Sequence, residues 1–187
     1  MHSFVTNQTI AFLCIALIVA AIYDLGFYKI PNMLNFTLIA FSVSYYGWTH
    51  GLDGLLFSIS GMFLGVALLI GPYLLGGMGA GDAKLMGAVG AVLGPKGVFI
   101  SFLYTAIVGG IYAGIMLMMY RSHAKNISGT IITGIKSFLL TRQWVTDSSE
   151  NYEKSPKLCY GLAIALGTIS YLALEWMGYN FFSEFRW

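Results

Sequence analysis

Charged side chains are scarce in this sequence: Asp, Glu, Lys and Arg together make up 10% of its 187 residues, whereas a soluble domain carries about 25%. Hydrophobic residues make up 57%, and the mean hydropathy is +0.74. Long apolar runs recur between short polar breaks. This composition excludes an ordinary soluble domain and predicts an all-α, polytopic membrane protein. We expect residues 1–187 to form a single integral-membrane domain, without room for a second folded module.

Cysteine and histidine are also rare, and the few present are scattered. Cys14 and Cys159 are isolated, without a Cys-x-x-Cys pair, and His2, His50 and His123 form no ligand cluster. These spacings indicate neither a zinc site nor a disulfide framework, so we expect no metal and no cofactor. The formal net charge of +2 gives no indication of a nucleic-acid partner.

The apolar runs predict six transmembrane helices, at about residues 10–23, 33–48, 55–75, 82–93, 98–120 and 159–177. The first run has no basic region ahead of it and no Ala-x-Ala site after it, so we interpret it as a retained span. The fourth run would make a helix of about 18 Å, against a hydrocarbon core of about 30 Å. We expect it to be extended by the loop before it or to lie in a thin, water-accessible region.

Basic residues fix the expected orientation. With six spans, one side of the membrane receives only Lys96 and Arg186, and the other receives Lys29, Lys84, Arg121, Lys125, Lys136, Arg142, Lys154 and Lys157. The positive-inside rule then places both termini outside and the basic loops in the cytoplasm. The longest polar interruption, 121–157, contains isoleucines at helical spacing. This pattern predicts an amphipathic helix in the lipid interface, or a groove for a partner.

The most unusual stretch is 76–84, in which four glycines and Asp82 lie between two apolar runs. Glycine leaves such a loop little backbone preference and allows close approach of other segments. An acid at the mouth of an apolar helix is costly in lipid, so Asp82 should face a partner or a water-filled cavity. The alternative is a flexible turn in which Asp82 caps the next helix.

A second acid, Asp24, ends the first apolar run, and the expected topology puts it on the same side as Asp82. Two carboxyls crowded in a site of restricted solvation do not both ionise easily, so one is expected to keep its proton. One can then act as a base on water while the other donates to the carbonyl under attack. Structural caps and an ion site are the alternatives that the residues leave open.

Asp24 followed by Lys29-Ile30-Pro31-Asn32, and then Gly79-Ala80-Gly81-Asp82-Ala83-Lys84, resembles the type IV prepilin peptidases. These are intramembrane aspartyl proteases with a Gly-x-Gly-Asp motif. The resemblance extends to a Tyr160-Gly161 step at the start of the last span, although Cys159 stands there in place of an expected Pro. It covers nearly the whole chain.

The resemblance implies an endopeptidase of the bacterial cytoplasmic (inner) membrane that cleaves the leader of prepilin-like proteins after a Gly, on the cytoplasmic side. Asp24 and Asp82 would be the catalytic pair, and Gly79 and Gly81 would let the loop bring Asp82 into place. The chain lacks the Cys-x-x-Cys insertion of the longer members. It is similar to the short Tad-type enzymes that serve Flp pilins, for which neither zinc nor methylation is expected.

Two lysines near the acids have weaker indications of a role. Lys84 and Asp82 are two residues apart and point in different directions on a helix, so we expect Lys84 to meet lipid headgroups or another loop. Lys29 is a candidate substrate contact or a membrane anchor, and Glu175 is expected at the interface. A competing function is a non-enzymatic ion or proton pathway through paired aspartates, although no internal repeat is evident. A peptidase of the same fold acting on other membrane proteins is a third.

Overall fold

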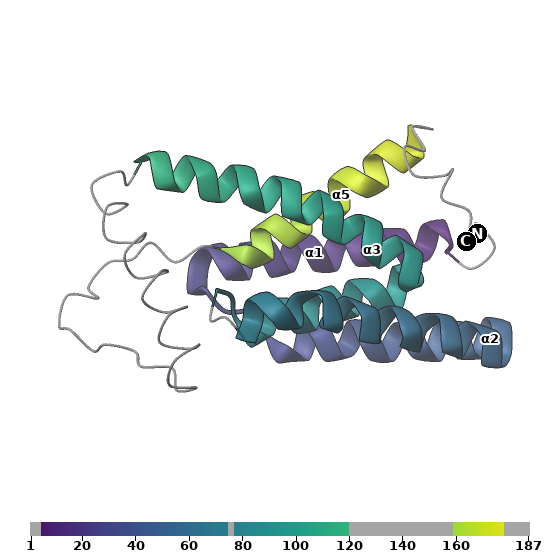
Figure 1. The fold of residues 1–187 in the computed structure, drawn as a ribbon. Helices are drawn as coiled ribbons and strands as arrows, with labels where there is room; N and C mark the ends of the chain where they lie inside the picture. The colour runs from purple at the N-terminus through teal and green to yellow at the C-terminus, as the bar shows by residue number, and fades with distance from the viewer. Residues whose placement is uncertain (1–4, 75–76, 120–158, 178–187) are drawn as a thin grey trace, which may run out of the picture. The chain divides into compact units, whose positions relative to one another are not determined.

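The computed structural model describes residues 5–74, 77–119 and 159–177. Throughout these ranges the regular secondary structure is helical, in four elements: α1 (Asn7–Phe27), α2 (Asn32–Leu74), α3 (Ala80–Met119) and α5 (Tyr160–Trp176) (Figure 1). The expectation of an all-α protein is confirmed. Three of these helices, α1, α2 and α3, are long and apolar enough to cross a membrane.

Two of the elements are bent at a glycine. In α2 the backbone of Gly51 has φ 61° and ψ −137°, which no helix contains, and a positive φ of this kind favours glycine. The rings of Tyr46 and Phe57, on either side of the bend, lie 5.4 Å apart between centroids. In a straight helix these residues would be about 16 Å apart along the axis, so the chain folds back at Gly51 (Figure 1).

The second bend, in α3, lies at Gly94, where φ is 72° and ψ is −179°. Pro95 follows and has no N–H to donate to the carbonyl of Ala91, four residues earlier. Ser58 donates its hydroxyl to that carbonyl at 2.8 Å instead, and Tyr46 donates to the carbonyl of Val92 at 2.8 Å. Side chains of α2 therefore satisfy the backbone groups that the bend in α3 releases.

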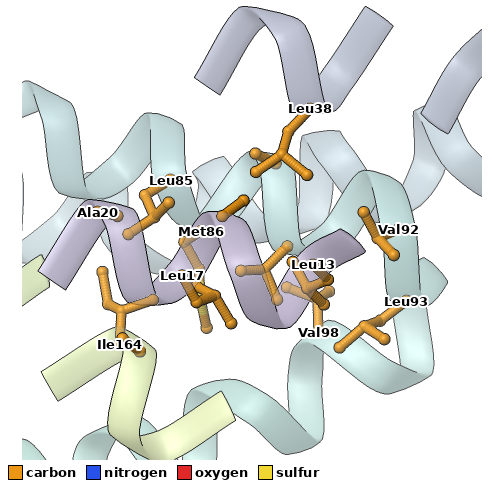
Figure 2. Close-up of a cluster of buried hydrophobic side chains, with 14 of the residues drawn as sticks. Leu13, Leu17, Ala20, Leu38, Leu85, Met86, Val92, Leu93, Val98 and Ile164 are labelled. Carbon is orange, nitrogen blue, oxygen red and sulfur yellow. The ribbon is translucent and has the colours of Figure 1, made fainter. Parts of the chain in front are cut away.

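The part of α3 before the bend, residues 80–93, is the short segment whose placement the sequence left open. Its side chains are almost completely buried, with Leu85, Met86 and Val89 all at 0% exposure. They join a hydrophobic core with side chains of the neighbouring helices, including Leu17 and Ile164 (Figure 2). The helix begins at Ala80, two residues before Asp82, so the loop extends it as expected, and its side chains pack inside the bundle.

Close packing around this segment depends on the absence of side chains. A Cβ added to Gly61 of α2 would overlap the carbonyl oxygen of Gly90, and a Cβ on Gly90 would overlap that of Gly61. The two backbones therefore touch directly. Gly61 and Gly65 are four residues apart, a spacing of small residues that permits close helix contact, and both glycines meet the backbone of α3 in this way.

The bends fall within the turns expected at 49–54 and 94–97, and they divide the described chain into six helical segments. The number of membrane spans and their orientation stay predictions. The amphipathic helix expected within 121–157 lies outside the described residues. The described residues up to Gly110, together with 159–177, belong to one compact unit, and α3 from Ile111 onward belongs to a second. All the predicted site residues are in the first unit.

Candidate active site

Asp24 lies in the last turn of α1, where its side chain is 6% exposed. The helix ends soon after it because Tyr28 takes up a left-handed conformation, with its N–H donating to the carbonyl of Asp24 at 2.9 Å. The thiol of Cys159 donates to the same carbonyl at 3.9 Å. The residue that replaces the expected Pro therefore contacts the backbone of the first acid.

The carboxyl of Asp24 faces the N-terminus of α5. The backbone N–H of Leu162 donates to its Oδ2 at 3.3 Å, and the N–H of Gly161 also bonds this carboxyl. The first N–H groups of a helix have no partner within the helix, and the helix dipole favours negative charge there. A Cβ on Gly161 would lie 2.9 Å from Oδ2, so this approach requires glycine.

Asp82 is the third residue of α3 and is 8% exposed. Its Oδ2 accepts a hydrogen bond from the N–H of Gly79 at 3.0 Å. A side chain that reaches back to an N–H just before its helix forms one half of a capping box. Asp82 therefore does cap its helix, as the alternative predicted, although it does so from the third helical position and not from the residue before the helix. This hydrogen bond fixes the orientation of the carboxyl.

The structure brings the segments around the two aspartates together, although 58 positions separate the aspartates in the chain. Both carboxyls are buried. A Cβ on Gly161 would lie 2.9 Å from Oδ2 of Asp24 and 2.9 Å from Cδ1 of Ile30, and a Cβ on Gly81, the residue before Asp82, would lie 3.4 Å from the Cβ of Ile30. Ile30 therefore lies between the surroundings of the two acids.

The segment between α1 and α2 supports the loop that carries Asp82. Ile30 is buried and packs against Gly81: a Cβ on Gly81 would lie 3.4 Å from the Cβ of Ile30. Asn35, which is 1% exposed, donates through Nδ2 to the carbonyl of Gly81 at 3.3 Å. Packing and a hydrogen bond therefore hold the residue immediately before Asp82.

The two glycines of the predicted motif have ordinary backbone conformations. Neither Gly79 nor Gly81 has a positive φ, so left-handed backbone is not what this loop needs. This loop needs glycine for close contact instead, because Gly81 meets Ile30 and a Cβ on Gly79 would lie 3.4 Å from Oδ2 of Asp82.

The two lysines lie at the edge of this arrangement. Lys84 donates to Oδ1 of Asn32 at 3.0 Å, and its ammonium lies 5.8 Å from the centre of the Phe36 ring. The expected partners were lipid headgroups or another loop; both observed contacts are residues of helix α2, so Lys84 helps to join the start of α3 to the start of α2. Lys29 is exposed. Within the described ranges neither lysine forms an ion pair with either aspartate.

Sequence reasoning gave no role to Ile30, Asn35, Gly161 or Leu162, all of which contact an aspartate or the residue beside one. One signal was available: the Tyr160-Gly161 step opens an apolar run on the membrane side expected for both acids. Among the described residues, no three His, Cys, Asp or Glu side chains gather where they could hold a metal ion.

Comparisons with known proteins place the chain in a family. The profile of the type IV leader peptidase family matches residues 11–114, which is more than half of the chain and includes both aspartates. A prepilin leader peptidase/N-methyltransferase of Bacillus subtilis (strain 168) is 30% identical over 111 residues, covering 56% of this chain. The chain matches 43% of that protein's length. No solved structure matches. The chain belongs to the type IV leader peptidase family.

Proposed function

We propose that this protein is an intramembrane aspartyl endopeptidase that cleaves the leader of prepilin-like precursors, with Asp24 and Asp82 as its catalytic pair. The observation that carries the proposal is the pair of buried carboxyls, on α1 and α3, whose neighbouring residues Gly161 and Gly81 both lie against Ile30. Each is oriented by backbone N–H groups on Oδ2. Family membership supplies the reaction class.

The chemistry follows from one shared proton. Two interacting carboxyls in a poorly solvated site carry one negative charge more easily than two. The ionised carboxyl takes a proton from water, whose oxygen attacks the scissile carbonyl carbon, while the protonated carboxyl donates its proton to the carbonyl oxygen. The proton taken from water then goes to the leaving nitrogen as the C–N bond breaks, and one hydroxyl of the tetrahedral gem-diol returns its proton to the carboxylate that had acted as the acid. The pair returns to its starting state with one proton.

The substrate class rests on the resemblance and on the B. subtilis relative, whose name is that of a prepilin leader peptidase and methyltransferase. We propose the peptidase reaction alone: hydrolysis after a Gly that precedes a hydrophobic helix, at the cytoplasmic face of the bacterial inner membrane. The aspartates lie near helix ends, where a substrate can reach them from the edge of the bilayer.

The purified protein in detergent should shorten a prepilin-type precursor whose leader ends in Gly. Asp24→Asn and Asp82→Asn should each abolish cleavage, because an amide neither accepts a proton from water nor supplies one, and the double variant should be no worse than either single variant. Asp53→Asn, which changes an exposed aspartate in the α2 bend, is the matched control and should keep the parent rate. A folded single variant that processes precursor at the parent rate would remove that residue from the pair. If both folded single variants process it at the parent rate, the ion-pathway alternative becomes the better one.

The cytoplasmic location has its own test. Leu25 and Ala80 are exposed beside the two acids, so Leu25→Cys and Ala80→Cys, in a background without Cys14 and Cys159, should react with a membrane-impermeant thiol reagent applied from the cytoplasmic side. Labelling from the outside alone would contradict the orientation and leader cleavage in the cytoplasm.

A further inference from the structure

One side chain touches both halves of the site. Ile30, in the turn after α1, is 9% exposed. A Cβ added to Gly81 would lie 3.4 Å from the Cβ of Ile30, and a Cβ added to Gly161 would lie 2.9 Å from the Cδ1 of Ile30. Gly81 immediately precedes Asp82, and Gly161 immediately precedes the residue whose N–H binds Asp24. Ile30 therefore fills the space between the two segments that orient the acids.

We propose that Ile30 is a positioning residue that sets the separation of the two carboxyls, a role that rests on the proposed aspartyl peptidase function. Its two ends meet different segments: the Cβ end faces the loop of Asp82, and the Cδ1 end faces the start of α5. Both neighbours are glycines, which allow the isoleucine to reach the backbone on each side.

The side chain is well suited to act as a spacer. Isoleucine is branched at Cβ, so its χ1 angle is restricted. Pro31 follows it and restricts the backbone of Ile30 to extended conformations. The next residues are tied to the start of α3, through Lys84 to Asn32 at 3.0 Å and Asn35 to the carbonyl of Gly81 at 3.3 Å. Because the side chain is rigid and its turn is anchored, the distance between the loop of Asp82 and the start of α5 depends on the size of Ile30.

Ile30 is also part of the hydrophobic core, so a loss of activity alone would not separate positioning from packing. Leu13 of α1 provides the matched control because it is a buried aliphatic residue of the same core, 0% exposed, and lies far along α1 from Asp24. Ile30→Ala and Leu13→Ala both shorten a four-carbon aliphatic side chain to a methyl group. A purely structural role predicts similar effects of the two changes, whereas a positioning role predicts a specific effect of the first.

The first measurement is cleavage of the Gly-leader precursor, with variants compared at a temperature where circular dichroism shows them folded. A misplacement of about 1 Å can cost about 100-fold in rate, so we expect Ile30→Ala to lower kcat by roughly that factor with little change in KM. Ile30→Val keeps the contact with Gly81 but lacks Cδ1, and it should lose activity by a smaller factor. Leu13→Ala should stay near the parent rate. Equal kcat losses in Ile30→Ala and Leu13→Ala would contradict the proposal.

The second measurement does not depend on cleavage, so it separates a failure of this inference from a failure of the proposed function. Carboxyl carbons of the four aspartates can be followed by NMR during a pH titration of the full-length protein in detergent. The effect of Asp24→Asn on the titration midpoint of Asp82 reports the coupling of the two acids. Ile30→Ala should reduce that effect, and Leu13→Ala should leave it unchanged. An undiminished effect in Ile30→Ala overturns the proposal, even if the precursor is never cleaved.

Discussion

The two buried aspartates are oriented by segments of different origin. Asp82 is held by the N–H of Gly79, three residues away in the same loop, whereas Asp24 is held by the N–H of Leu162, 138 residues away. The position of Asp82 therefore depends on the conformation of one short loop. The position of Asp24 depends on how α5 packs against α1. Changes at the start of α5 should disturb Asp24, and changes in the loop should disturb Asp82.

The largest expected effect in this comparison comes from Gly161→Ala. The new Cβ would lie 2.9 Å from Oδ2 of Asp24 and 2.9 Å from Cδ1 of Ile30, so the carboxyl or the helix must move. We expect precursor cleavage to fall about 100-fold. Gly110→Ala is the control, because a Cβ there meets nothing within 4 Å. A Gly161→Ala enzyme with the parent kcat would show that the contact with α5 does not position Asp24.

The corresponding change on the Asp82 side depends on size. In Gly81→Ala the added Cβ would lie 3.4 Å from that of Ile30, which is an ordinary contact, so activity should change little. Gly81→Val adds two more methyl groups against a buried isoleucine, and overpacking of this kind costs about 1–3 kcal/mol. We expect cleavage by the valine variant to drop roughly tenfold or more. Initial rates of both variants measure this, and equal activities would indicate an ordinary turn residue.

Lys84→Met should have the smallest effect. It removes the hydrogen bond to Asn32 and the contact with the Phe36 ring. These contacts join the start of α3 to the start of α2 near the site, and neither involves a carboxyl group. A single hydrogen bond contributes about 0.5–1.5 kcal/mol. The thermal midpoint should fall by a few degrees while the cleavage rate stays close to that of the parent. Abolished cleavage in a folded Lys84→Met protein would assign the lysine a direct part in the reaction.

The sequence predicted the features that depend on neighbouring residues. Apolar runs indicated the helical segments, and the turns expected around Gly51 and Gly94 contain the bends, because glycine and proline act on their own backbone. The capping contact of Asp82 is also local, so it was among the alternatives considered. These features need no knowledge of the tertiary fold.

Contacts of particular side chains with distant segments were not predicted. Nothing in the residues near Ile30 shows that it will meet both Gly81 and Gly161, because hydropathy assigns it only to an apolar neighbourhood. The short segment of α3 was recognised by its length, but its burial among the other helices was not predicted. Which segment occupies the centre of a bundle is decided by packing among all of them.

The central position of that segment also bears on how the protein is made. As a helix, residues 80–93 extend about 21 Å, less than the hydrocarbon core of about 30 Å, so this piece cannot persist in a bilayer as an independent span. Asp82 reaches its final position only after this segment has packed against other helices. The last described helix to leave the ribosome is α5, which bonds Asp24. Both acids therefore reach their final positions at the end of biogenesis. Under the proposed function, a chain that lacks α5 would lack the N–H that binds Asp24 and would not cleave other proteins in the membrane.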